Sequence, residues 1–476
     1  MEFTELADYA LPSGHLTTWV PTTRCGGEHW TVDSRPLAYV HEDHCARSTA
    51  HTGPGSWLGS VFEIHHRFDS DKLRNALRKW MLRHESFRTT VVDTVDVEGN
   101  IAFSRSTHSG EMLDIDEFPH GTLGSREVGD HIVEFFDRNL SPFMWPHCIA
   151  ATITGADDAD SFLLVFGADH SVMDAYSMVL AISEIRRLYE FELFGTDPAL
   201  PEVGSHLDFS VRDREIGSSV AAGHDAVRTW ERFLALSGGQ FPAFPLPLGS
   251  PGAAVDGPNR QGSVSSWMLT APQAEAIAAH CRDAGHNMQS AILAAMALAN
   301  QELSGSPFLR YAMPMHTRHE FEYRSSVGWY VGIIPIEVNV QHADTVAEYL
   351  SAATTAVGNA RELSRIPYPR VAQLLANNST PRFAISYLDV RYVPDAEEWQ
   401  RWRAHTLRSS AGSADEVYFW IVRSPAGLTI SARFPPNPTA SANVHRMIET
   451  FRHMLTSLAG NGTFPSGSHV HERAAS

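Results

Sequence analysis

Residues 166–177 read FGADHSVMDAYS and join a predicted strand to a predicted helix. The apolar run 161–168 has the length and composition of a buried central strand. Residues 175–194 place apolar side chains at helical spacing, and Gly195 follows as a stop signal. A strand and a helix on either side hold a short loop in place, so His170 within that loop can face a cleft.

His170 and Asp174 are the two residues of this loop with chemical potential. An imidazole has an ordinary pKa near ~6.5, so it can be neutral near pH 7 and accept a proton from a hydroxyl group. Asp174, four positions later, can cap the following helix or bind a cation. The spacing His-x-x-x-Asp alone also fits a structural pair, so the choice between a catalytic and a structural role depends on the surrounding sequence.

Strands and helices alternate outward from this loop in both directions, which predicts an α/β protein with two comparable lobes. The expected helices are 71–84 (capped by Ser70), 175–194, 227–236, 272–284, 289–303, 345–363 and 442–458. The expected strands are 61–68, 161–168, 264–269, 308–313, 333–340, 383–388, 417–422 and 428–434.

The clearest break in the chain is 241–259, FPAFPLPLGSPGAAVDGPN, whose prolines and glycines exclude a long regular element. We therefore predict an N-terminal lobe over 1–240 that carries the His170 loop and a C-terminal lobe over 241–460. Residues 461–476 are rich in Gly and Ser and lack periodicity, which predicts a flexible tail.

Composition excludes several classes of protein. The 476 residues are 43% hydrophobic and 19% charged, which is typical of globular proteins. The net charge of −18 disfavours nucleic acid and anionic membrane surfaces as partners. The four cysteines, Cys25, Cys45, Cys148 and Cys281, include no C-x-x-C pair, so we expect no zinc ribbon or thioredoxin-type site. No metal is expected.

The sequence shows no targeting signal. Its first residues, MEFTELADYALPSG, lack the basic and apolar regions of a secretory signal. The longest apolar run, 291–299, is far shorter than the roughly 20 residues of a membrane-spanning helix. We predict a cytoplasmic protein without a transmembrane segment, and a place at the inner membrane surface stays open.

The loop resembles the His-His-x-x-x-Asp-Gly signature of the condensation-domain and chloramphenicol-acetyltransferase-like superfamily. Further segments resemble that superfamily in the same order along the chain. They are LRHESFRTT (82–90), MPMHTR (313–318), GWYVGIIPI (328–336) and FAISYL (383–388). Together they span roughly residues 35–460, so the resemblance covers nearly the whole chain.

Within the superfamily the sequence is similar to the polyketide-associated acyltransferases of mycobacteria, especially those that build trehalose glycolipids. The segments HLTTWVPT (15–22), PFMWPHC (142–148) and FPAFPLPLG (241–249) carry this similarity. The resemblance implies two chloramphenicol-acetyltransferase-like lobes that form a pseudo-dimer with a central cleft or tunnel. It also implies an O-acyltransferase that moves a fatty acyl group from coenzyme A, or from a carrier-protein thioester, to a hydroxyl of a trehalose-type sugar or glycolipid.

The resemblance further implies the partners and the residue roles. Coenzyme A would be a substrate rather than a bound cofactor, a polyketide synthase could be a partner, and a monomer is expected. His170 matches the general base, and Asp174 matches the structural Asp that pairs with an Arg, for which Arg318 is the candidate. Ser386 lies where the family often has Asn or Ser, and its hydroxyl could bond near the reacting carbonyl.

Two positions depart from the signature: Asp169 replaces its first His and Ala175 replaces its Gly. Because neighbours at a strand end point to opposite faces, position 169 should face away from His170. If the two did approach, the carboxylate could raise the pKa of the imidazole. A small residue at 175 suffices unless φ is positive there.

Three other functions compete with this interpretation. The first is a condensation-type catalyst that acts on a carrier-bound natural-product intermediate. The second is a homologue that binds an acyl-carrier protein or polyketide synthase without turnover, which Asp169 and Ala175 would favour. The third is a His/Asp metal hydrolase.

Other conspicuous side chains fit structural roles better than chemical ones. The histidines outside the loop are expected to be structural or solvated, and the aromatic residues are expected to be core, with some of them lining an acyl tunnel. These residues are His65, His66, His84, Arg88, His316, His319, Trp329, Tyr330, Trp402, Phe419 and Trp420.

Overall fold

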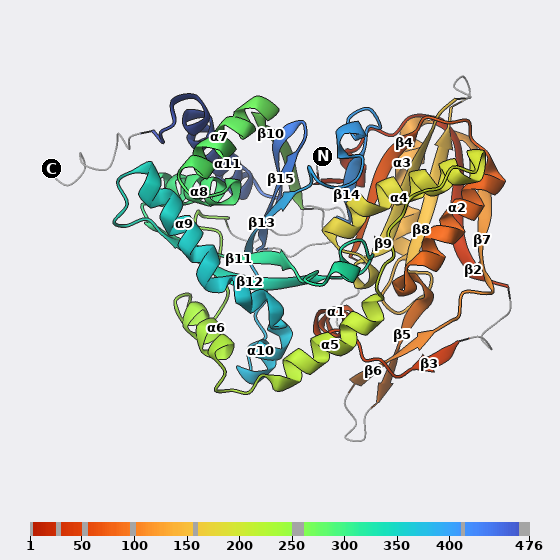
Figure 1. Ribbon diagram of the computed structural model, residues 1–476, viewed down its shortest axis with the longest axis horizontal. Coiled ribbons are helices and arrows are strands. Elements are labelled where there is room, and N and C mark those ends of the chain that lie inside the picture. Colours follow the sequence, from red (N-terminus) through yellow and green to blue (C-terminus); the bar gives the residue numbers. More distant parts are fainter. Residues whose placement is uncertain are drawn as a thin grey trace.

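The computed structural model describes residues 3–24, 30–49, 56–95, 101–155, 160–249, 261–410 and 415–465. Three predicted features lie outside these ranges: Cys25, residues 250–259 of the predicted linker, and residues 466–476 of the predicted tail. Two lobes lie side by side in Figure 1, each built on its own sheet. The chain is therefore a mixed α/β protein with the two lobes expected from the sequence.

The first lobe contains a seven-stranded sheet in the order β1-β14-β4-β9-β8-β2-β7. Its strands are β1 (Phe3–Glu5), β14 (His405–Arg408), β4 (Trp57–Ile64), β9 (Phe162–Asp169), β8 (Cys148–Thr154), β2 (Gly14–Thr23) and β7 (Leu113–Leu123). A separate three-stranded sheet consists of β3 (Thr31–Asp33), β6 (Ile101–Thr107) and β5 (Thr89–Val95). The strand that leads to His170, β9, lies in the middle of the large sheet.

Helices cover both faces of this sheet, which explains why every residue of β9 is buried. Phe162, Leu164 and Phe166 pack toward α2 (Ser70–Arg83) and α4 (Ala175–Phe194). The alternate residues Leu163 and Val165 pack toward α3 (Ser125–Asn139). Burial on both sides fixes β9 firmly, and with it the position of the residues that follow.

Local signals place the two helices that flank the site. The bounds of α4 agree with the sequence prediction: Asp174 caps its first turn by accepting from Ser177 N, and Gly195 ends it in a left-handed conformation. Helix α2 is capped by Asp69, whose side chain accepts from Lys72 N, so the prediction of Ser70 as the cap is wrong. A carboxylate beside the helix N-terminus also gains from the helix dipole.

The strand predicted over 61–68 begins and ends four residues earlier, as β4, and its residues are mostly buried. The prediction of solvent-facing polar positions fails because β4 lies inside the sheet, between β14 and β9. His65 and His66 follow the end of β4 and are partly exposed.

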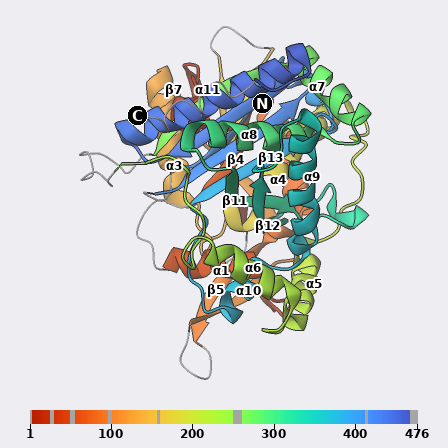
Figure 2. The same ribbon diagram turned by 90° about the vertical axis from the view of Figure 1, so that its left-hand side faces the viewer.

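The second lobe contains a six-stranded mixed sheet in the order β10-β16-β15-β13-β11-β12. Its strands are β10 (Gly262–Thr270), β16 (Gly427–Phe434), β15 (Val417–Ser424), β13 (Phe383–Asp389), β11 (Phe308–His316) and β12 (Val331–Asn339). Its apolar core lies against the helices α7 (Ala271–Asp283), α8 (Met288–Ser304), α9 (Val346–Ala360) and α11 (Pro438–Asn461). Figure 2 shows these helices in front of the sheet.

A group of four helices and one shared strand connect the lobes. Helices α1 (Tyr39–Thr49), α5 (His206–Ser219), α6 (Asp225–Ala235) and α10 (Tyr368–Leu374) lie together below the sheets in Figure 1. Strand β14 comes from the second half of the chain but pairs with β1 and β4 of the first sheet. The predicted boundary after residue 240 follows α6 and precedes β10, yet the second half contributes one strand to the first lobe.

None of the helices within the described ranges is both long enough and apolar enough to cross a membrane.

Candidate active site

His170 begins a single helical turn, η4 (His170–Val172), between β9 and α4. Its backbone N–H donates to the Ser56 carbonyl at 3.0 Å, and the N–H of Asp169 donates to the His147 carbonyl at 2.8 Å. The imidazole is partly exposed and lies against Trp329, with ring centroids 3.9 Å apart and planes at 28°. Trp329 belongs to the segment that leads into β12, so residues far apart in sequence meet at this ring.

The environment of His170 keeps its ring neutral. Burial, followed by the neighbouring His44, lowers the pKa of His170 to about 4. Asp169 acts to raise that pKa, in the direction expected of a nearby carboxylate, and so does Asp174, but burial outweighs both. At neutral pH the imidazole is therefore unprotonated and able to accept a proton.

The two ring nitrogens of His170 differ in their surroundings. Nδ1 is buried and has no hydrogen-bond partner in another residue, while the His170 carbonyl interacts with the ring and favours its protonated form. A proton on Nδ1 directed at this carbonyl would be the matching neutral tautomer. The lone pair that is left for proton transfer is then that of Nε2.

Asp174 and Arg318 form a buried ion pair beside His170. Both side chains are almost fully buried, and Nη2 of Arg318 donates to Oδ1 and Oδ2 of Asp174 at 2.8 and 2.9 Å. Burial acts to raise the pKa of Asp174, but Arg318 and the hydrogen bonds from Ser177 and Tyr330 outweigh it, so the pKa is lowered. The carboxylate is ionised at neutral pH and matches the charge of Arg318.

The other terminal nitrogen of Arg318 also has partners, whereas its buried Nε has none among the described residues. Nη1 donates to the carbonyls of Tyr323 and Ser326, and the guanidinium lies 4.1 Å from the centre of the Tyr330 ring. The pair thus ties the start of α4, in the first half of the chain, to the segment that contains Tyr323, Ser326 and Tyr330 in the second.

Backbone contacts hold residues 327–330 against the first half of the chain. Val327 N donates to Nδ1 of His84 at 3.2 Å, and Tyr330 N donates to Asp174 at 2.9 Å. Nε2 of His206 lies 3.1 Å from the Trp329 carbonyl, where its N–H can donate. Trp329 is therefore fixed from both sides, and it fixes the plane of His170 in turn.

Gly328 is required at this junction by close approach. Its N–H donates to Ser177 Oγ at 3.2 Å, and Ser177 Oγ donates to its carbonyl at 3.0 Å. An added Cβ would lie 2.6 Å from the nearest ring atoms of His206. The backbone can reach α4 and α5 together only because no side chain intervenes.

Gly328→Ala is expected to lower the free energy of unfolding by about 1–3 kcal/mol, because the added methyl overpacks the His206 contact. Urea denaturation measures this change. Gly358→Ala is the matched control: Gly358 lies in α9 with no atom within 4 Å of an added Cβ, and alanine favours the helix. Equal stability of the two variants would contradict a tight junction at Gly328.

The structure brings together three of the four residues singled out by sequence, His170, Asp174 and Arg318. Ser386 lies on β13 opposite Trp420 of β15, and no contact joins its side chain to His170 in the described part of the chain. Ala175 has no positive φ, as a small residue at a helix start allows.

Sequence reasoning missed two neighbours of His170. Trp329 was interpreted as core, although it stacks on the His170 ring. His44, on α1, was not considered at all, yet its ring centroid lies 6.3 Å from that of His170. Trp329 lies in GWYV (328–331), at the start of a segment that resembles the superfamily, and that resemblance was a usable signal. Nothing in the local sequence around His44 links it to residue 170.

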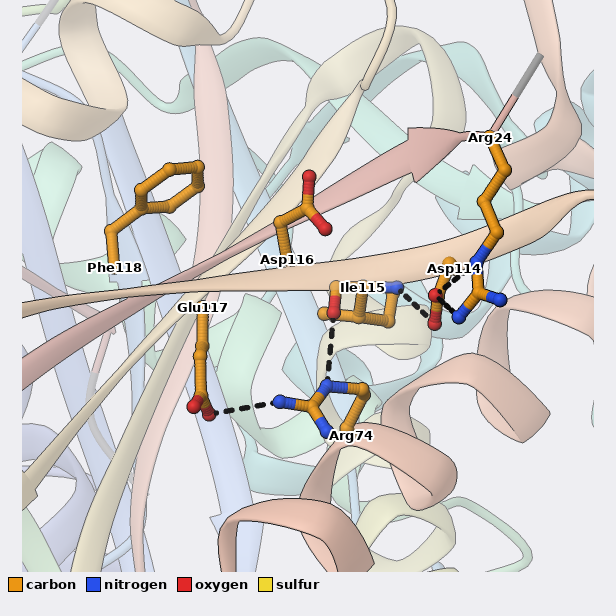
Figure 3. Close-up of a pocket in the computed structure, with 7 residues that line it drawn as sticks. All are labelled: Arg24, Arg74, Asp114, Ile115, Asp116, Glu117 and Phe118. Atoms are coloured by element: carbon orange, nitrogen blue, oxygen red, sulfur yellow. Dashed lines mark hydrogen bonds and ion pairs between the residues drawn. The ribbon is translucent and has the colours of Figure 1, made fainter.

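A surface pocket at the far edge of the first sheet lies apart from these residues. Figure 3 shows it beside β7, where Arg24 pairs with Asp114 and Arg74 with Glu117. Most of its polar groups are paired with one another, and none of its lining residues belongs to the His170 loop or to the segment 327–330.

Two lobes that meet near a neutral imidazole at the end of a buried central strand define the class of two-lobed acyl-transferring enzymes. Residues 50–468 match the family described as "Condensation domain". The chain belongs to that family, and it is an acyltransferase with two chloramphenicol-acetyltransferase-like lobes.

Curated relatives match along nearly their whole length. The chain is 24% identical to "Acyltransferase PapA3" of Mycobacterium tuberculosis, over 96% of each chain. It is also 24% identical to the same organism's "2'-acyl-2-O-sulfo-trehalose (hydroxy)phthioceranyltransferase PapA1", over 97% of this chain and 90% of that one.

Solved structures share the fold. "PapA2 acyl transferase" superposes with a TM-score of 0.83 at 20% identity, over 97% of this chain and all of that one. The condensation domain of the polyketide synthase MokA superposes with a TM-score of 0.70 at 16% identity, over 91% of this chain and 99% of that one.

Proposed function

We propose that this protein transfers a fatty acyl group from a thioester to a hydroxyl of a trehalose-type sugar or glycolipid, with His170 as the general base. The observation that carries the proposal is the neutral His170 ring, held at the end of β9 against Trp329. The relatives named as acyltransferases, one of them acting on a sulfated trehalose, support the class of acceptor.

The proposed reaction uses the His170 tautomer in which Nε2 carries the lone pair. Nε2 of His170 takes the proton of the acceptor hydroxyl while its oxygen attacks the thioester carbonyl. The tetrahedral intermediate carries a negative oxygen, and its collapse breaks the carbon–sulfur bond. The proton on Nε2 then passes to the departing sulfur, so an ester and a free thiol leave and the imidazole is neutral again.

Asp174 and Arg318 support this step without touching the reacting atoms. They hold the start of α4 against the segment 327–330, and thus keep Trp329 over the His170 ring. We propose that the donor is a coenzyme A thioester or a carrier-protein thioester that reaches His170 through a cleft or tunnel between the lobes. Ser386 remains a candidate donor of a hydrogen bond near the carbonyl.

A screen of donors and acceptors tests the proposal. The purified protein is incubated with acyl-CoA of several chain lengths or an acylated carrier protein, and with trehalose, sulfated trehalose, simple alcohols, amines or a carrier-bound amine, and thiol release, donor binding and product masses are recorded. Acylated sugar with an equal amount of thiol is the expected result. Transfer only to an amine or to a carrier-bound intermediate would favour a condensation-type catalyst, and acyl-CoA or carrier binding without product would favour a non-catalytic homologue.

The pH profile gives a separate prediction. Because the pKa of His170 is lowered to about 4, the neutral base persists well below the ordinary imidazole range. The ratio kcat/KM should therefore change less than about twofold between roughly pH 6 and pH 8 and fall only as pH approaches the pKa of the free enzyme. Rates are measured together with circular dichroism to exclude unfolding. A half-maximal rate near pH ~6.5 would contradict the proposed environment of His170.

A further inference from the structure

Asp169, the residue that replaces the first His of the signature, has a partner on another element. Its Oδ1 lies 3.2 Å from Nε2 of His44 on α1, and the same oxygen accepts from Ser171 N at 2.8 Å. Asp169 is fully buried. The partner of Asp169 is thus not His170 but His44, whose ring lies beside that of His170.

The charge on Asp169 fixes how His44 is held. Burial acts to raise the pKa of Asp169, but His44 and the hydrogen bonds to the carboxylate outweigh it, and the pKa is lowered. An ionised carboxylate only accepts hydrogen bonds, so Nε2 of His44 must carry the proton that it shares with Asp169. The ring of His44 is then fixed in one orientation by a charged, buried acceptor.

His44 reaches His170 through Trp329. The His44 ring meets the indole edge-on, with centroids 5.5 Å apart and planes at 73°. The indole also stacks on His170, with ring centroids 3.9 Å apart. The ring centroids of His44 and His170 are themselves 6.3 Å apart, so the three rings form a triangle, and a rotation of His44 would remove one contact of the indole that stacks on His170.

We propose that Asp169 and His44 form a positioning pair that, through Trp329, aims Nε2 of His170 at the acceptor hydroxyl. The inference rests on the proposed function and adds to it a pair of residues, one of which lies outside the signature. The pair touches neither the donor nor the acceptor, so its contribution is to orientation. A base that is turned away by a fraction of an ångström or a few degrees loses rate while the substrates still bind.

Three variants test the pair: Asp169→Asn, His44→Phe and the double variant. Each single variant should lower kcat about 10- to 100-fold while KM for the acyl donor stays within about threefold, because orientation and not binding is lost. The double variant should be no slower than the slower single variant, since one broken pair cannot be broken twice. The exchange His44→Asp with Asp169→His should recover part of kcat by restoring the pair in reverse.

The matched control is His41→Phe. His41 is buried on the same helix one turn earlier, and neither of its ring nitrogens has a hydrogen-bond partner. Its replacement should leave kcat unchanged. An equal loss of kcat in His41→Phe, additive losses in the double variant, or unchanged kcat in both single variants would overturn the proposal. If Asp169→Asn does not fold, His44→Phe and His44→Gln decide by the same split between kcat and KM.

A measurement without turnover separates this inference from the proposed function. In protein labelled with ¹⁵N-histidine, the ring signals of His44 and His170 are assigned from the His44→Phe and His170→Ala variants. Asp169→Asn should shift both sets of signals, whereas His41→Phe should shift neither of them. If the wild-type protein acylates no alcohol but these shifts occur, the proposed function fails and the pair stands. If transfer occurs and the His170 signals do not respond to Asp169→Asn, the pair fails alone.

Discussion

His170→Ala is expected to lower kcat for acyl transfer by about 10²- to 10⁴-fold, the contribution typical of a general base. The variant loses the imidazole that stacks on Trp329 and that, in the proposed mechanism, takes the proton of the acceptor. Thiol release from acyl-CoA in the presence of the best acceptor is the measurement. Binding of acyl-CoA, followed by calorimetry, should change little, because the lost group acts on the hydroxyl rather than on the donor.

Two controls make this result specific. His65→Ala removes a partly exposed histidine of the first lobe whose ring contacts only the Arg401 carbonyl and Glu63 in the described part of the chain, and it should retain full activity. His170→Gln keeps a polar side chain of similar size but cannot take up a proton at neutral pH, so it should be as slow as His170→Ala. A rate within a few fold of the wild type in either His170 variant would remove this residue from the mechanism.

Asp174→Ala is expected to lower the free energy of unfolding by about 3–5 kcal/mol, because it leaves the buried Arg318 charge without its partner. Arg318→Met should cost a similar amount for the same reason. Urea unfolding curves at neutral pH are the measurement, and activity should fall in parallel, since Trp329 loses its anchor. The double variant Asp174→Ala with Arg318→Met should cost less than the two single losses together.

The exposed pair of Arg310 and Glu337 on β11 and β12 provides the comparison. Glu337→Ala should cost at most about 1 kcal/mol, because water screens a partly exposed pair.

Acid should also weaken the buried pair: the pKa of Asp174 is lowered on folding, so its stabilisation is complete above the ordinary carboxyl pKa and is lost as pH falls through the folded value. Wild-type stability for Asp174→Ala would contradict a structural role.

Local chemistry made α4 and the site loop predictable. The cap at Asp174 and the stop at Gly195 are encoded by residues within the helix ends, and the bounds of α4 follow from them alone. The apolar run of β9 likewise indicated a strand buried on both faces. The pairing of Asp174 with Arg318, 144 positions apart, came from resemblance, because no local pattern contains it.

The features that were missed depend on contacts between distant segments. His44 lies on a helix whose sequence gives no sign of what it faces, and its link to Asp169 spans 125 positions. Strand β14 has four residues, and it is a strand only because β1 and β4 supply its hydrogen bonds. Trp329 is a large aromatic residue of the kind that fills cores, and only its contact with His170 in the folded protein distinguishes it from a core residue.

The place of β14 has a consequence for how the protein is made. The first sheet is complete only when His405–Arg408 pairs with β4, and β1 at the start of the chain has β14 as its neighbour. On the ribosome, β4 therefore keeps one open edge until residues 405–408 have been translated, more than 300 positions after β4 itself. The first sheet can therefore be completed only after this part of the second half has been synthesised, so the two lobes complete their folding together.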